Sequence, residues 1–265
     1  MVILIINNYR DEKGLQKIEE IKKALLYLGI SEVKIWSYYE VCQPLSEDVK
    51  GIILSGSESH LNEPEAREIY SSEIEFVKKV NIPILGICFG HQLIGVAFGS
   101  NIYSLPDAIK GFVSVKILQP DAIFSSWKEG DTVSLKQHHT DCLSELPKDF
   151  ICLAESESCK IEAMMHKTKP IYGIQAHIER YDKEYPEGLQ VLKNFVENVV
   201  ENFAFEQIIE IKSLSEIKQA IINSLKDIEW DIIKEDWRTV ETKLNNAKKY
   251  LNACYVKKLV NALKP

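Results

Sequence analysis

The 265-residue sequence has little that would favour disorder or a membrane span. It holds only nine prolines, twelve glycines and no low-complexity tract, so most of the chain should be folded. No apolar run approaches the roughly 20 residues that a membrane helix needs. The apolar start, residues 1–6, is too short for a signal peptide and has no basic flank. We therefore expect no contact with membranes and a cytoplasmic protein.

The six cysteines form no CxxC pair and have no regular spacing. This excludes a recognisable disulfide framework and a zinc knuckle, and it favours a reducing compartment. Six residues could be considered as metal ligands: His138, His139, Cys142, Cys152, Cys159 and His166. Their spacing matches no known metal motif. We therefore predict no metal site and no cofactor in this chain.

Basic residues are fewer than acidic ones, 32 against 39, and they are not clustered. A surface that binds nucleic acid needs grouped Lys and Arg to neutralise phosphates. The net charge of −7 therefore argues against a nucleic-acid partner. A small-molecule substrate is the better expectation.

Short apolar runs alternate with amphipathic segments in the first part of the chain. We predict strands at residues 2–6, 33–36, 51–54, 84–87 and 171–174, and helices at 15–28, 66–80 and 188–202. This alternation predicts an α/β fold, a doubly wound and mostly parallel sheet with helices on both faces. Strand-like segments at 112–118, 132–135, 150–154 and 160–165 predict a small antiparallel section. Residues 208–263 predict two or three helices.

Cys88 lies between two glycines, in the segment GICFGHQ, where an apolar strand changes to a helical pattern. This arrangement predicts a strained turn that presents a nucleophile, like the serine elbow of α/β hydrolases. The following helix would point its amino end at the sulfur and favour the reactive thiolate. A buried, inert cysteine is the alternative, and most lone cysteines are of that kind.

A histidine and a glutamate that could serve Cys88 occur in the segment GIQAHIE. His177 follows the predicted strand 171–174, so it should emerge at the same edge of the sheet as Cys88. Glu179 would orient the imidazole and stabilise its charged form. A surface histidine beside a solvated glutamate is the alternative for such a pair in isolation.

Together the two motifs, GxCxGxQ at 86–92 and GxQxHxE at 173–179, resemble the glutaminase domain of class I glutamine amidotransferases. The resemblance covers residues 1–203 and leaves 204–265 as a helical C-terminal extension. Within the family, the glutaminase part of GMP synthetase is the most similar, because of GICFGHQ and a helix containing LKNF.

The resemblance implies hydrolysis of the glutamine side-chain amide through a γ-glutamyl thioester on Cys88, with His177 as the base and Glu179 as its orienting group. Backbone N–H groups of Ser57 and Phe89 would form the oxyanion hole. The family usually has glycine at the position of Ser57, and it commonly has an aromatic residue before the histidine and a proline after it. A phosphate-binding loop is the rival interpretation of the segment SGSES.

The resemblance also implies residues that hold glutamine. They are Gly56, Gln92, Gln137, His138, His139 and Thr140. A polar turn with one satisfied histidine is the alternative for the segment QHHTD.

The chain contains no ATP-binding motif of a synthetase. The ammonia acceptor should therefore lie in a separate synthetase, with GMP synthetase as the candidate. Apolar residues of segment 206–265 could dock that synthetase or a second copy of this chain, or pack on their own domain. Two further functions stay open: a stand-alone γ-glutamyl hydrolase and a catalytically silent binding module.

Overall fold

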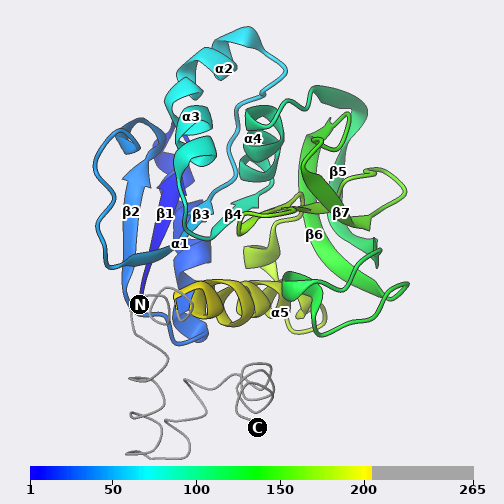
Figure 1. Ribbon diagram of the computed structural model, residues 1–265. Helices are drawn as coiled ribbons and strands as arrows, with labels where there is room; N and C mark the ends of the chain where they lie inside the picture. Colours follow the sequence, from blue (N-terminus) through cyan, green and yellow to red (C-terminus); the bar gives the residue numbers. More distant parts are fainter. Residues whose placement is uncertain (205–265) are drawn as a thin grey trace, which may run out of the picture. The chain divides into compact units, whose positions relative to one another are not determined.

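The computed structural model describes residues 1–204 of the chain. Its strands form one nine-stranded sheet with the order β2-β1-β3-β4-β9-β8-β7-β5-β6. Figure 1 shows the parallel strands β1 to β4 (blue and cyan) beside the antiparallel ones (green). The strands are β1 Val2–Asn7, β2 Val33–Ser37, β3 Val49–Leu54, β4 Ile84–Ile87, β5 Ile102–Ile117, β6 Thr132–Leu143, β7 Phe150–Glu155, β8 Ala163–His166 and β9 Ile171–Ile174. The predicted helical extension, residues 204–265, lies outside the described residues except for its first residue.

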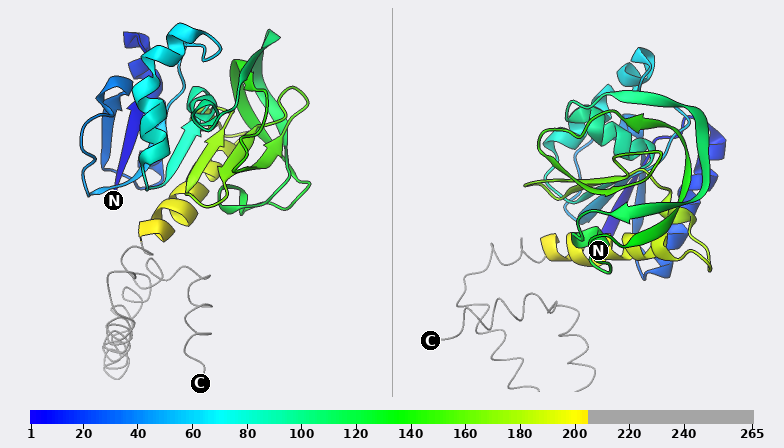
Figure 2. Two further views of the ribbon diagram at one scale, coloured as in Figure 1. Left: turned by 45° about the horizontal axis from the view of Figure 1, so that its top comes forward. Right: turned by 90° about the vertical axis from the view of Figure 1, so that its right-hand side faces the viewer.

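Five neighbouring strands, β2, β1, β3, β4 and β9, pair in parallel. The other four strands, β8, β7, β5 and β6, add to the β9 edge in antiparallel pairs. Figure 2 shows this antiparallel part curling away from the parallel strands. The α/β prediction, with a mostly parallel sheet and an antiparallel section, is confirmed.

Two layers of helix cover the sheet because its central strands are apolar on both faces. The α-helices are α1 Glu12–Tyr27, α2 Pro64–Ile69, α3 Ser71–Lys79, α4 Phe89–Ala97 and α5 Glu187–Asn194. In β1, Ile3 and Ile5 pack with α1 and α5 in one core, whereas Leu4 and Ile6 pack with α3 and α4 in the other. This alternation is what a strand buried on both faces requires.

Four elements differ clearly from their predicted bounds. Strand β5, predicted at residues 112–118, begins ten residues earlier, at Ile102. The predicted helix 66–80 is two helices, because the backbone at Tyr70 (φ −94°, ψ 11°) leaves the helical region between α2 and α3. Strand β6 continues beyond its predicted end at residue 135 to Leu143 and pairs with β5, with an irregularity between Ser104 and Ile109 of β5. After α5 the chain continues as a π-helical segment, Phe195–Glu201.

The predicted strand 132–135 ends before the segment QHHTD, but the structure places this segment inside β6. Gln137, His138 and His139 pair with Gly111, Lys110 and Ile109 of β5. Pairing with β5 therefore keeps the backbone of these polar residues in the sheet.

In the described part of the chain no helix is long and apolar enough to cross a membrane.

Candidate active site

Cys88 occupies a strained turn between β4 and α4. Its φ of 52° makes it the one non-glycine residue with positive φ among residues 1–204, and such strain clusters at functional sites. The two flanking glycines are required by close packing. A Cβ on Gly86 would lie 2.4 Å from the carbonyl oxygen of Gly90, and a Cβ on Gly90 would lie 2.5 Å from that of Leu54.

Backbone and side-chain contacts hold the Cys88 thiol at the carboxyl edge of the parallel strands. The Cys88 N–H donates to the carbonyl of Ile174 at the end of β9 (2.8 Å). The side-chain amide of Gln175 donates to the sulfur (Nε2 to Sγ, 3.6 Å). Cys88 occupies the N-cap position of α4, so it directly precedes the first helical turn, whose N–H groups have no intrahelical acceptor.

His177 and Glu179 follow β9, the neighbour of β4, and form a buried pair. His177 Nδ1 lies 2.7 Å from Glu179 Oε1, and both side chains are at most 5% exposed. The His177 N–H donates to the carbonyl of Lys136 in β6 (2.7 Å), which fixes where the imidazole leaves the sheet. The alternative of a surface histidine beside a solvated glutamate is therefore wrong.

His177 and Glu179 each stabilise the charged form of the other. Burial alone lowers the pKa of His177, but Glu179, Cys88 and hydrogen bonds to both outweigh it and raise the pKa to about 10. Burial raises the pKa of Glu179, but the charge and hydrogen bond of His177 outweigh this and lower it overall. At neutral pH the arrangement therefore favours His177 as an imidazolium beside the carboxylate of Glu179.

One cavity of about 320 Å³ brings most of the predicted residues together. Its walls include these predicted residues: Ser57, Cys88, Phe89, Gln92, His138, His139, Thr140 and His177. They come from the loop after β3, from α4, from β6 and from the segment after β9. The cavity can therefore hold a small polar molecule against a nucleophile and its base.

Three predicted residues lie behind the cavity wall. Glu179 does not line the cavity but contacts the Nδ1 atom of His177. Gly56 packs so closely that a Cβ there would lie 2.7 Å from the Tyr9 hydroxyl and 3.0 Å from His177 Cε1. Gln137 is fully buried, and its side-chain amide donates to the Glu162 carboxylate (2.8 Å), so its side chain is committed elsewhere.

The loop after β3 holds Ser57 without a left-handed backbone, although the family usually has glycine there. The Ser57 hydroxyl donates to the carbonyl of Asn8 (2.8 Å). It also lies 3.2 Å from the hydroxyl of Tyr70, which donates to the same Asn8 carbonyl (2.6 Å). Serine is accommodated here because its side chain anchors the loop to the segment after β1.

The contacts of Asp141 join residues that no sequence motif links to one another. Asp141 is buried, and its carboxylate lies 2.7 Å from His60 Nδ1 and accepts from the Ser104 hydroxyl (2.7 Å). Gln92 donates to the Asp141 carbonyl (2.8 Å). These contacts tie the loop after β3 to β5 and β6. Tyr9, Lys17, Glu58, Lys110 and Arg180 line other parts of the wall.

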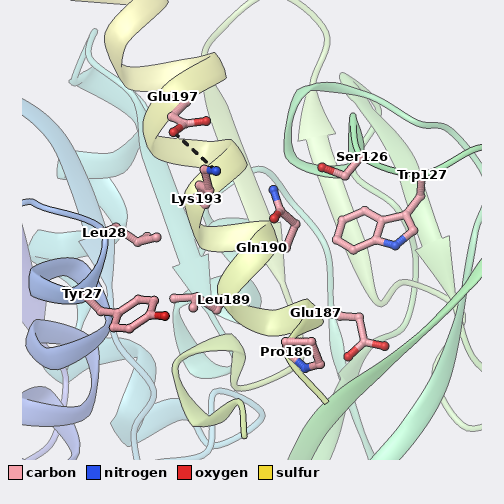
Figure 3. A pocket seen from close by; sticks show the side chains of 10 residues that line it. All are labelled: Tyr27, Leu28, Ser126, Trp127, Pro186, Glu187, Leu189, Gln190, Lys193 and Glu197. Carbon is pink, nitrogen blue, oxygen red and sulfur yellow. Dashed lines mark ion pairs between the residues drawn. The ribbon is translucent and has the colours of Figure 1, made fainter. Parts of the chain in front are cut away.

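A larger cavity, about 650 Å³, lies away from Cys88. Figure 3 shows that its walls come from the end of α1, the segment around Trp127 and α5, where Lys193 pairs with Glu197 (3.9 Å). Tyr27, Leu28 and Leu189 contribute apolar surface. It contains no nucleophile with a base, so the smaller cavity is the candidate active site.

Within residues 1–204 no three His, Cys, Asp or Glu side chains are grouped so that they could hold a metal ion. Cys142 and His139 are close (3.8 Å), but Cys152 donates to the carbonyls of Ala154 and Lys160 instead. The candidate site itself brings together a thiol, an imidazole and a carboxylate.

Comparison with known proteins is consistent with this geometry. The sequence model "Glutamine amidotransferase class-I" matches residues 11–199. The chain is 36% identical over 194 residues to a subunit of the glutamine-hydrolysing GMP synthase of Methanothermobacter thermautotrophicus, covering 73% of this chain and 96% of that relative. It is 37% identical over 199 residues to the corresponding subunit of Pyrococcus abyssi, covering 73% and 96%.

A solved structure is also similar. The crystal structure of a Thermoplasma acidophilum protein, described as a subunit of GMP synthase, superposes with a TM-score of 0.65 at 25% identity. The superposition covers 78% of this chain and 97% of that one. The matched family region ends at residue 199, before the C-terminal extension.

Proposed function

Because the chain belongs to the class I glutamine amidotransferase family, we propose that it hydrolyses the side-chain amide of glutamine on Cys88 and delivers the ammonia to a separate GMP synthetase subunit. Family membership confirms the predicted enzyme class. The observation that carries the proposal is the strained Cys88 in one cavity with the buried His177–Glu179 pair.

The proposed reaction uses these three groups in turn. The Cys88 thiolate attacks the amide carbon of glutamine and forms a tetrahedral intermediate. His177, as imidazolium, gives its proton to the departing nitrogen, so ammonia leaves and a γ-glutamyl thioester remains. His177 then takes a proton from water, which attacks the thioester and releases glutamate. Glu179 keeps the imidazole in orientation and stabilises its charged form throughout.

Backbone N–H groups of Ser57 and Phe89 are proposed to hold the oxyanion of both tetrahedral intermediates. Phe89 is the first residue of α4, and the N–H groups of a first helical turn have no intrahelical acceptor. Both residues line the cavity beside Cys88. Two such donors act at the atom on which charge develops, where they contribute most to the rate.

Residues of β6 and α4 are proposed to hold the rest of glutamine. Gln92, His138, His139 and Thr140 line the cavity and offer amide, imidazole and hydroxyl groups to the substrate. Gly56 contributes by leaving room for Tyr9 and His177, and Gln137 contributes through its backbone in β6. No cofactor is required by this chemistry.

The acceptor of the ammonia is inferred from relatives that are named as subunits of glutamine-hydrolysing GMP synthase. Segment 206–265 is proposed as a docking element for the synthetase or for a second copy of this chain. The cytoplasmic location stays a prediction.

The test combines the full chain with the GMP synthetase subunit of the same source and measures GMP formation. The proposal expects formation with glutamine as the nitrogen donor, its loss in Cys88→Ala, and its rescue by ammonium salts. Formation that needs ammonium salts even with wild-type chain would refute delivery to GMP synthetase. A shortened chain, residues 1–205, would test the docking role of the extension in the same assay.

A further inference from the structure

The carboxylate of Glu179 faces a second cation besides His177. The Nε atom of Arg180 lies 3.7 Å from Glu179 Oε1, the same oxygen that lies 2.7 Å from His177 Nδ1. The Glu179 side chain is 3% exposed, so water screens these charges little. One buried carboxylate oxygen is therefore shared between an imidazole and a guanidinium.

Arg180 is held in this place by another part of the fold. Its Nε–H donates to Glu20 Oε2 in α1 (2.8 Å), and its side chain is 19% exposed, against 45% for Glu20. The side chain also lines the catalytic cavity. The contact with α1 fixes a permanent positive charge beside the carboxylate, because a guanidinium does not lose its proton.

Other titratable and charged groups face this cluster from several elements. They are Tyr9, Lys17, Glu20, Cys88, Lys110 and His138. Lys17 and Lys110 add positive charge at the cavity wall, whereas Glu20 partly neutralises Arg180. Burial together with His177, Arg180 and the two lysines lowers the pKa of His138, which favours its neutral form.

We propose that Arg180 is a positioning residue that weakens the hold of Glu179 on the His177 proton, and that Glu20 sets how strongly it does so. The inference rests on the proposed function, because His177 must return its proton to the departing ammonia. A carboxylate that faced His177 alone would bind that proton more tightly. Arg180 therefore keeps the imidazolium acidic enough to act as a proton donor.

Three substitutions separate the charge of Arg180 from its packing. Arg180→Gln removes the charge and keeps a polar side chain, so the upper pH limit of glutamine hydrolysis should rise by about half a unit or more. Arg180→Lys keeps the charge and should lie between wild type and Arg180→Gln. Glu20→Gln keeps an acceptor oxygen for Arg180 but removes the neutralising charge, so the limit should fall. Lys193→Gln, in α5, is the control and should change nothing.

The decisive readout is the titration of the His177 imidazole by NMR in a Cys88→Ser background, since it needs no turnover. Opposite shifts for Arg180→Gln and Glu20→Gln support the inference even if no variant hydrolyses glutamine, in which case only the proposed function fails. Far-UV circular dichroism confirms that each variant is folded.

Two results would overturn the inference. One is an unchanged His177 titration in both folded variants. The other is a rise in KM for glutamine in Arg180→Gln with an unchanged titration and an unchanged kcat, because that outcome would make Arg180 a substrate-binding residue instead.

Discussion

Replacing Gly90 by alanine perturbs the nucleophile turn with the smallest possible group. A Cβ on Gly90 would lie 2.5 Å from the carbonyl oxygen and 2.7 Å from the Cβ of Leu54, the last residue of β3. Ordinary contact begins at 3.4 Å, so the two backbones must separate by roughly 0.9 Å. A backbone cannot rotate away as a side-chain end can, so the shift must reach α4 or the end of β3.

The shift would fall between the two segments that carry the proposed oxyanion hole. The chain that leaves Leu54 carries Ser57, and α4 begins with Phe89 next to Cys88. Overpacking of this kind costs about 1–3 kcal/mol of stability. A displacement near 1 Å in a catalytic site costs about 10²-fold in rate. We therefore expect Gly90→Ala to remain folded and to lose about 10²-fold in kcat/KM for glutamine.

Gly95→Ala is the matched control in the same helix. Its Cβ would lie 2.3 Å from Cδ2 of Leu143, the far end of a flexible side chain that can adopt another rotamer. Both variants should lose stability in urea unfolding, but Gly95→Ala should keep activity within a few fold of wild type. Equal activity losses in the two variants, or full activity in Gly90→Ala, would refute the role assigned to the turn.

Two further predictions concern buried carboxyl groups. Glu179→Gln removes the charge that raises the pKa of His177. The upper pH limit of glutamine hydrolysis should therefore fall, and kcat should drop on the order of 10³–10⁴-fold. An unchanged kcat together with an unchanged pH profile would contradict this prediction. Burial raises the pKa of Glu73 from its ordinary 4.5 to about 8. Between pH 4.5 and pH 8 the Glu73 carboxyl is therefore protonated in the folded state and ionised in the unfolded state. Stability should fall by about 1.4 kcal/mol per pH unit as pH rises through that window. Glu73→Gln should remove this slope and be more stable by roughly 3 kcal/mol at pH 7, and identical pH dependence of wild type and variant in urea unfolding would contradict the assignment.

Sequence patterns brought the candidate catalytic residues together because parallel strands have their carboxyl ends at one edge of the sheet. Cys88 follows β4 and His177 follows β9, and these strands are neighbours in the sheet. The glycines beside Cys88 mark a close approach of backbones, which local sequence reveals. The same reasoning placed Gln92, His138, His139 and Thr140 around one cavity.

Contacts between distant segments could not be predicted in this way. Arg180 and Glu20 are 160 residues apart, and His60 and Asp141 are 81 apart. Neither pair belongs to a periodic pattern or a short motif. The extent of β6 was missed because Gln137 and its neighbours are polar, and their place in a strand depends on pairing with β5.

The most direct test of the central assignment is release of glutamate and ammonia from glutamine by the full chain. Wild type, Cys88→Ala and Cys42→Ala should be compared, each with and without the synthetase subunit, because Cys42 is an exposed cysteine far along the chain from the turn. The account predicts release by wild type and Cys42→Ala and none by Cys88→Ala. Release that survives in Cys88→Ala, or no release by wild type under either condition, would contradict it.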